Sequence, residues 1–135
     1  KLWHLVEPLF LERKNMSTKS NPKPKSESEI QTECLNYLLK KGVFCWRNNN
    51  GSVYDPKLQQ YRSFVGLKGV SDIIAITPPT AKQCGGLFVG IEVKIPTGKL
   101  STHQGIFRDR CYRHNAEYHV VTSLDDIKAL DYLWG

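Results

Sequence analysis

The sequence GVSDIIAI at positions 69–76, followed by LFVGIEVKI at positions 87–95, decides the fold of this chain. Both runs are short, apolar and rich in β-branched residues, which is typical of buried strands. Asp72 opens the first run, and Glu92 and Lys94 lie near the end of the second. Charged groups in a mostly apolar, central strand are costly to desolvate unless they have a task. We therefore interpret the three groups as parts of one functional site.

The spacing of Glu92 and Lys94 places both side chains on one face of their strand, because successive strand residues point to opposite faces. Asp72 and Glu92 on neighbouring strands would offer the oxygen ligands that Mg²⁺ and Mn²⁺ prefer, with the backbone carbonyl of Val93 as a further ligand. Such an ion activates water and neutralises the charge of a phosphodiester. Lys94 would orient the attacking water and offset developing negative charge. The alternative is an exposed Glu-Lys pair at a sheet edge.

The segment 26–41 predicts a helix with its apolar face on Ile30, Cys34 and Leu38, and with a second row of Leu35 and Leu39. Ser26 and Glu29 have the spacing of a capping box, and Gly42 ends the helix.

A third carboxylate for the site is expected from the start of this helix. Glu27 lies on the stripe that continues through Gln31 to the apolar face, whereas Glu29 has a capping task, so the spacing favours Glu27. A first-turn acidic residue that stabilises the helix dipole is the alternative interpretation of Glu27.

A second helix is expected over residues 100–114, with Ser101 and Gln104 spaced as another capping box. Gln104 is also the first inward polar group after the Glu-Val-Lys strand, where it would hold a phosphate or the attacking water. We expect both roles together only if its side chain rotates away from the cap.

The remaining elements complete the order α-β-β-β-β-α-β-α in a single α/β domain over residues 26–135. Strands are predicted at 43–48, 60–65 and 117–122, a turn at Asn49-Asn50-Gly51, and a last helix that Ser123 caps and that runs to about Leu133. Residues 1–25 are expected to be an N-terminal extension and a Ser/Lys/Pro linker, and the first 15 do not resemble a signal peptide.

The charge of the chain favours a polyanionic partner. It has 135 residues, a formal charge of +6 and a pI near 9.2. Arg47, Lys68 and Lys99 are the best candidates for contacts with DNA phosphates. In the hairpin region, Tyr54 and Tyr61 would stack on unpaired bases or pack across strands.

Trp46 and Cys45 are expected in the core, as is Cys34. The four cysteines form no Cys-x-x-Cys pair, which favours reduced thiols in an intracellular protein, in the cytoplasm of a bacterial or phage-infected cell or in the nucleus. No apolar run approaches the roughly 20 residues of a membrane span.

Four stretches taken together resemble the VRR-NUC family (virus-type replication-repair nucleases) of the PD-(D/E)xK superfamily. They are residues 27–31, 68–72, 91–94 and 98–104. The family's first-helix glutamate corresponds to Glu27, its metal aspartate to Asp72, its glutamate and lysine to Glu92 and Lys94, and its glutamine to Gln104. Ser71 stands where the superfamily has proline, a position that shapes the turn and supplies no ligand.

The resemblance implies a restriction-endonuclease-like mixed sheet flanked by helices, and cleavage of DNA that depends on Mg²⁺ or Mn²⁺. It further implies branched substrates, such as Holliday junctions or flaps, and a homodimer. The apolar stripe of the last helix or residues 2–11 would supply the dimer interface. Two alternatives stay open, a non-catalytic DNA-binding module with a nuclease fold and a sequence-specific restriction-type endonuclease.

Overall fold

A mixed four-stranded sheet forms the centre of the protein, in the order β1-β4-β5-β6. The structure, a computed structural model, describes residues 21–48, 52–63 and 66–135. β4 pairs antiparallel with both β1 and β5, and β6 runs parallel to β5. The strands are β1 (Phe44–Arg47), β4 (Ile73–Ile76), β5 (Phe88–Val93) and β6 (Glu117–Val121). The expected mixed α/β fold, with the Glu-Val-Lys strand at its centre, is confirmed.

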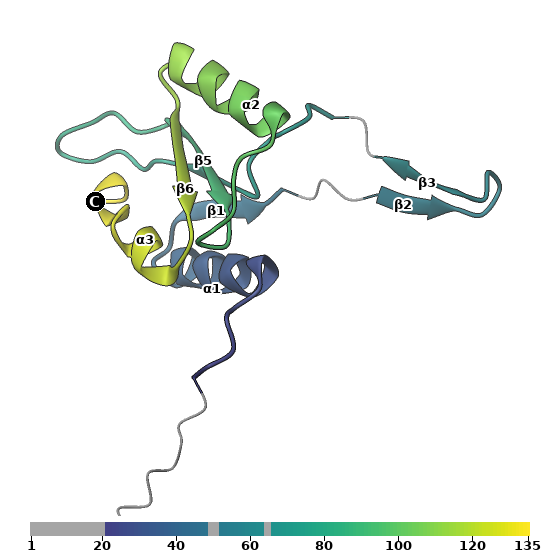
Figure 1. The fold of residues 1–135 in the computed structure, drawn as a ribbon. Helices are drawn as coiled ribbons and strands as arrows, with labels where there is room; N and C mark the ends of the chain where they lie inside the picture. The colour runs from purple at the N-terminus through teal and green to yellow at the C-terminus, as the bar shows by residue number, and fades with distance from the viewer. Residues whose placement is uncertain (1–20, 49–51, 64–65) are drawn as a thin grey trace, which may run out of the picture.

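Helices cover both faces of this sheet (Figure 1). On one face, α1 (Glu27–Lys40) and α3 (Leu124–Lys128) pack against the main core, which includes Ile73, Ile91 and Val121. On the other, α2 (Thr102–Arg113) covers a smaller aromatic cluster of Phe107, Cys111 and Tyr118. The α2 face is less completely covered. Its apolar cluster contains residues of β5 and β6 but none of β1.

A two-stranded hairpin extends away from the central sheet (Figure 1). It consists of β2 (Ser52–Asp55) and β3 (Gln60–Ser63), and Tyr54 faces Tyr61 across it with ring centroids 5.4 Å apart. β2 is an additional strand that the sequence patterns did not predict. The expected turn at Asn49-Asn50-Gly51 and the last two residues of the expected strand 60–65 lie outside the described residues.

The ends of α1 follow from its sequence. Of the two bonds expected for a capping box, the structure has the one from the Glu29 amide to the Ser26 hydroxyl, at 3.2 Å. At the other end, Gly42 adopts φ +75°, and the amides of Gly42 and Val43 donate to Leu39 and Leu38. These two hydrogen bonds end the helix, and the chain continues directly into β1.

Four expectations about the fold are wrong. Leu39 is 51% exposed and Trp46 is 41% exposed, so neither belongs to the core. The last helix ends at Lys128 and is followed by a separate 3-10 turn, η2 (Asp131–Leu133). The proposed dimer stripe of this region is also buried, because Ile127, Leu130, Leu133 and Trp134 pack in the main core, where they are unavailable to a partner. Residues 2–11 lie outside the described part of the chain.

Within residues 21–48, 52–63 and 66–135, no helix has the length and apolar character needed to cross a membrane.

Candidate active site

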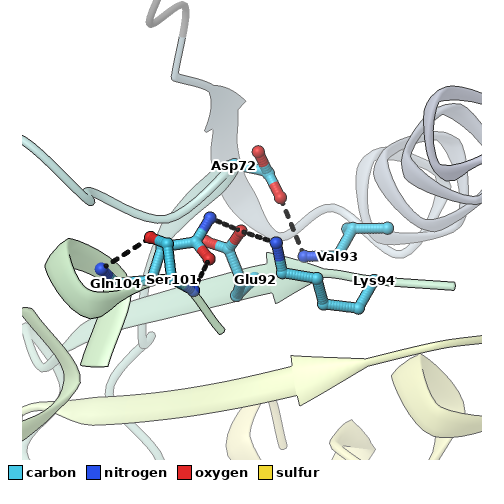
Figure 2. Close-up of polar contacts among 6 residues, drawn as sticks. All are labelled: Asp72, Glu92, Val93, Lys94, Ser101 and Gln104. Atoms are coloured by element: carbon cyan, nitrogen blue, oxygen red, sulfur yellow. Dashed lines mark hydrogen bonds and ion pairs between the residues drawn. The ribbon is translucent and has the colours of Figure 1, made fainter. Parts of the chain in front are cut away.

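Asp72 and Glu92 lie opposite each other on neighbouring strands. Ile73 is the register partner of Ile91, so the residues immediately before and after them, Asp72 and Glu92, face one another at the end of the β4–β5 pair. The amide of Val93 donates to Oδ2 of Asp72 over 2.8 Å (Figure 2). This bond fixes the Asp72 carboxylate beside β5, as the sequence patterns predicted for two carboxylates on adjacent strands.

The Glu92 side chain is buried and electrostatically unusual. It is 1% exposed, and its Oε2 atom is buried with no hydrogen-bond partner among the described residues. Burial, followed by the neighbouring Asp72 carboxyl, raises the pKa of Glu92 to about 8, while Lys94 opposes the shift. A carboxylate in this state needs a proton or a cation to compensate its charge.

Lys94 follows the last residue of β5 and turns to the same side as Glu92. Its Nζ lies 3.7 Å from Oε1 of Glu92, and its side chain is 13% exposed (Figure 2). The expected placement of Glu92 and Lys94 on one face is therefore present. The ammonium group is close to the carboxylate pair and still reaches solvent.

Gln104 connects the N-terminal cap of α2 to Glu92 through the two ends of its side-chain amide. Its Oε1 accepts from the Ser101 amide at 2.8 Å, and the Ser101 hydroxyl accepts from the Gln104 amide, which completes the predicted capping box. Its Nε2 donates to Oε1 of Glu92 over 2.7 Å (Figure 2). The expectation that Gln104 must leave the cap to reach the site is wrong, because one amide carries an acceptor and a donor at opposite ends.

Glu27 occupies the first turn of α1 and is exposed. Its negative charge contributes to the raised pKa of Glu92, so it acts on the site at a distance. No group of three His, Cys, Asp or Glu side chains in the described ranges is placed to hold a metal ion together. A ligand role for Glu27 accordingly stays a prediction.

The three basic residues predicted to contact DNA are all exposed. Arg47 donates to the Thr32 hydroxyl at 3.3 Å, which directs it toward α1. Lys68 lies in the turn before Asp72, and Lys99 lies shortly before α2. Their contacts with phosphate stay predictions.

Two buried hydroxyls near the site were not predicted. Ser71 is fully buried and Tyr118 is 3% exposed, and neither hydroxyl oxygen has a hydrogen-bond partner within the described part of the chain. Both flank Gly90, where an added Cβ would lie 2.5 Å from the Ser71 oxygen. Position in the motif pointed to Ser71 as a turn residue, whereas Tyr118 had no signal in the sequence because aromatic strand residues are common in cores.

The residues present fit a divalent metal ion. The Asp72 carboxyl helps to raise the pKa of the buried Glu92, so the structure places two acidic groups where their negative charges oppose each other. The buried, unpartnered Oε2 of Glu92 marks the point where a cation would complete the site. Mg²⁺ commonly takes only one or two protein carboxylates and fills its other positions with water and phosphate oxygens.

The fold and the site together define a nuclease-type α/β domain. A family model described as the VRR-NUC domain matches residues 25–125, so the chain belongs to the VRR-NUC family and carries a nuclease-fold, DNA-processing module. Among solved structures, the chain resembles one described as a VRR_NUC domain, with a TM-score of 0.54 and 21% identity over 81% of this chain and 97% of that chain. No curated protein matches.

Proposed function

We propose that this protein is a metal-dependent endonuclease that hydrolyses DNA phosphodiester bonds at the Asp72–Glu92 pair. The observation that carries the proposal is the buried Glu92, whose Oε2 has no hydrogen-bond partner in residues 21–48, 52–63 and 66–135 and whose neighbours are a second carboxylate and Lys94. This arrangement suits a hard divalent cation and a negatively charged substrate. Membership of the VRR-NUC family supports the same reaction.

Asp72 and Glu92 would hold Mg²⁺ or Mn²⁺, with the Val93 carbonyl and Glu27 as further candidate ligands. When bound, the ion supplies Lewis-acid activation of the phosphate and a water of lowered pKa. The Val93 amide holds Oδ2 of Asp72, so that carboxylate keeps its second oxygen for a ligand role. Gln104 holds Oε1 of Glu92, so the free oxygen of Glu92 is Oε2.

Lys94 would act on the attacking water and on the phosphate. Its ammonium group lies 3.7 Å from Oε1 of Glu92 and is partly exposed, so it can face both the carboxylates and a bound substrate. A positive charge held there orients a water by hydrogen bonding and stabilises the charge that develops on the phosphate oxygens.

We infer branched DNA, such as a Holliday junction or a flap, as the preferred substrate. The resemblance of the site motifs to VRR-NUC nucleases supports this inference, and the charge of +6 supports a nucleic-acid partner. One such site cuts one strand, so a two-fold homodimer would present two sites to the arms of a junction.

A cleavage panel tests the proposal. Labelled duplex, flap, single strand and four-way junction are incubated with the protein and Mg²⁺, Mn²⁺ or a chelator. We expect cleavage of branched substrates only with metal, and its loss in Asp72→Ala, Glu92→Ala and Lys94→Ala.

The matched control for these variants is Asp109→Ala, an exposed carboxylate on α2 whose ion pair is with the adjacent Arg108. We expect it to cut at the native rate. Salt-sensitive DNA binding without cleavage of any substrate would identify a binding module in place of an enzyme. Cutting of linear duplex at a fixed sequence would identify a restriction-type enzyme.

A further inference from the structure

Two exposed aromatic side chains lie on the same face of the sheet as the Asp72–Glu92 pair. In β1, Phe44 is 68% exposed and Trp46 is 41% exposed, while Cys45 between them is buried on the other face. Their ring centroids are 5.4 Å apart with an interplanar angle of 49°. Exposed Trp and Phe side chains in adjacent positions of one strand face form a continuous aromatic surface.

The register of the sheet connects this aromatic pair to the acidic site. Trp46 pairs with Ile74, and Ile74 pairs with Gly90, so these residues form one row across three strands. Asp72 and Glu92 belong to the next row, two residues further along the same strands. The Asn48 amide donates to the Asp72 carbonyl at 2.8 Å, which extends the pairing of β1 to that row.

Strand spacing gives the distance between the two features. Two residues along a strand span about 7 Å and two strands across span about 10 Å, so Trp46 lies about 12 Å from Glu92, measured between backbones. Stacked nucleotides rise by about 3.4 Å each. This distance corresponds to about three or four nucleotides.

The two sides of the acidic site differ in chemistry. On the α2 side lie Lys68, in the turn that packs against His103, and Lys99, shortly before α2. On the β1 side lie the rings of Phe44 and Trp46. A nucleic-acid strand has the complementary pair of surfaces, with charged phosphates along one side and flat apolar bases along the other.

We propose that Phe44 and Trp46 form a stacking platform for unpaired bases of a DNA strand whose phosphate lies beside the divalent ion proposed at Asp72 and Glu92. The proposal rests on the proposed function and specifies its substrate, since only a strand with unpaired bases beside the cut can use the rings. Base–aromatic stacking tolerates any sequence because every base has a π-face. Each ring is expected to strengthen binding of such a strand by about tenfold.

Binding without metal tests the platform separately from cleavage. Fluorescein-labelled single strand, flap and blunt duplex of equal length are titrated in chelator with wild type, Phe44→Ala and Trp46→Ala, and anisotropy gives each Kd. We expect each variant to bind single strand and flap about tenfold more weakly, with blunt duplex nearly unchanged. Trp46→Phe, which keeps an aromatic face, should restore most of the affinity.

Tyr132→Ala is the matched control, because Tyr132 is also 68% exposed but lies in η2, beside the α1 and α3 layer. It should bind all three DNAs as wild type does. Thermal melting confirms that each variant is folded. Unchanged binding of single strand and flap by both folded alanine variants would overturn the proposal. So would equal weakening on duplex, or a shift from dimer to monomer in sedimentation, which would assign the rings to self-association.

These outcomes do not depend on catalysis. If the wild-type protein cuts no DNA but binds single strands through Phe44 and Trp46, the platform stands and the proposed nuclease activity fails. If it cuts branched DNA while the aromatic variants bind single strands normally, the activity stands and the platform fails.

Discussion

Gln104 on α2 donates a hydrogen bond to Glu92 on β5 over 2.7 Å, while the other end of the same amide closes the cap of its own helix. The cap therefore fixes one oxygen of the carboxylate that is central to the proposed site. Helix capping and site geometry share one side chain here, so their contributions need variants that separate them.

Gln104→Ala should lower kcat by more than its loss of folding stability can explain. The change removes the donor to a buried carboxylate as well as the cap bond, and we expect a loss of about tenfold to a hundredfold in kcat. Ser101→Ala is the matched control, because it deletes the hydroxyl of the cap but keeps the backbone amide that holds Gln104. It should cost about 1 kcal/mol in free energy of unfolding and retain most of the activity. Equal losses of kcat in the two variants would contradict the positioning role.

Stability of the metal-free protein should fall as pH rises. The pKa of Glu92 is raised from 4.5 to about 8 in the folded protein, so the folded state keeps a proton that the unfolded chain releases between these values. Stability present below pH 4.5 is therefore lost as pH increases toward about 8. Urea unfolding in chelator at pH 5, 6, 7 and 8 measures this slope.

Glu92→Gln is the control for the pH experiment, because an amide does not titrate. Its free energy of unfolding should depend less on pH than that of wild type across the same window. Parallel curves for the two proteins would show that Glu92 is ionised in the folded state without a cation.

Gly69→Ala should destabilise the protein by roughly 2–5 kcal/mol in urea unfolding. Gly69 has φ +80°, and a Cβ there would lie 2.3 Å from the carbonyl oxygen of His103. The substitution would push the turn before Asp72 away from the start of α2. Gly66→Ala is the matched control, since a Cβ at Gly66 meets no atom of the described residues within 4 Å. A native free energy of unfolding in Gly69→Ala would show that this close packing is absent.

Lys94→Arg should lose most of the cleavage activity, because arginine cannot take the place of lysine at this position. The guanidinium group is planar and larger than the ammonium group, and the Lys94 side chain is only 13% exposed beside Glu92. We expect kcat to fall by at least about a hundredfold in single-turnover cleavage, with the Kd for DNA nearly unchanged because the positive charge is kept. Native kcat in this variant would mean that charge alone suffices.

Local sequence patterns predicted much of the fold. Ser26, Gly42 and Ser101 mark helix ends because capping depends on side chains a few residues apart. The spacing of Glu92 and Lys94 predicted that both lie on one strand face, because side chains two residues apart in a strand point to the same side. These signals act within one element and do not require knowledge of its neighbours.

The sequence patterns gave wrong predictions where the burial or contacts of a side chain depend on how helices and strands pack together. Trp46 was expected in the core, but β1 is an edge strand and the cluster under α2 does not extend to it, so the ring is exposed. Leu39 has the four-residue spacing from Leu35 that is typical of an apolar helix face, yet its side chain is 51% exposed. The two simultaneous roles of Gln104 depend on the distance from α2 to β5, which no spacing in the sequence specifies.

The central claim is that Asp72 and Glu92 hold one divalent ion together, and calorimetric titration of the protein with Mn²⁺ at pH 8 tests it most directly. Wild type should bind Mn²⁺, and Asp72→Asn and Glu92→Gln should each lower the affinity at least about tenfold while remaining folded. Wild-type affinity for Mn²⁺ in either variant would contradict the shared site.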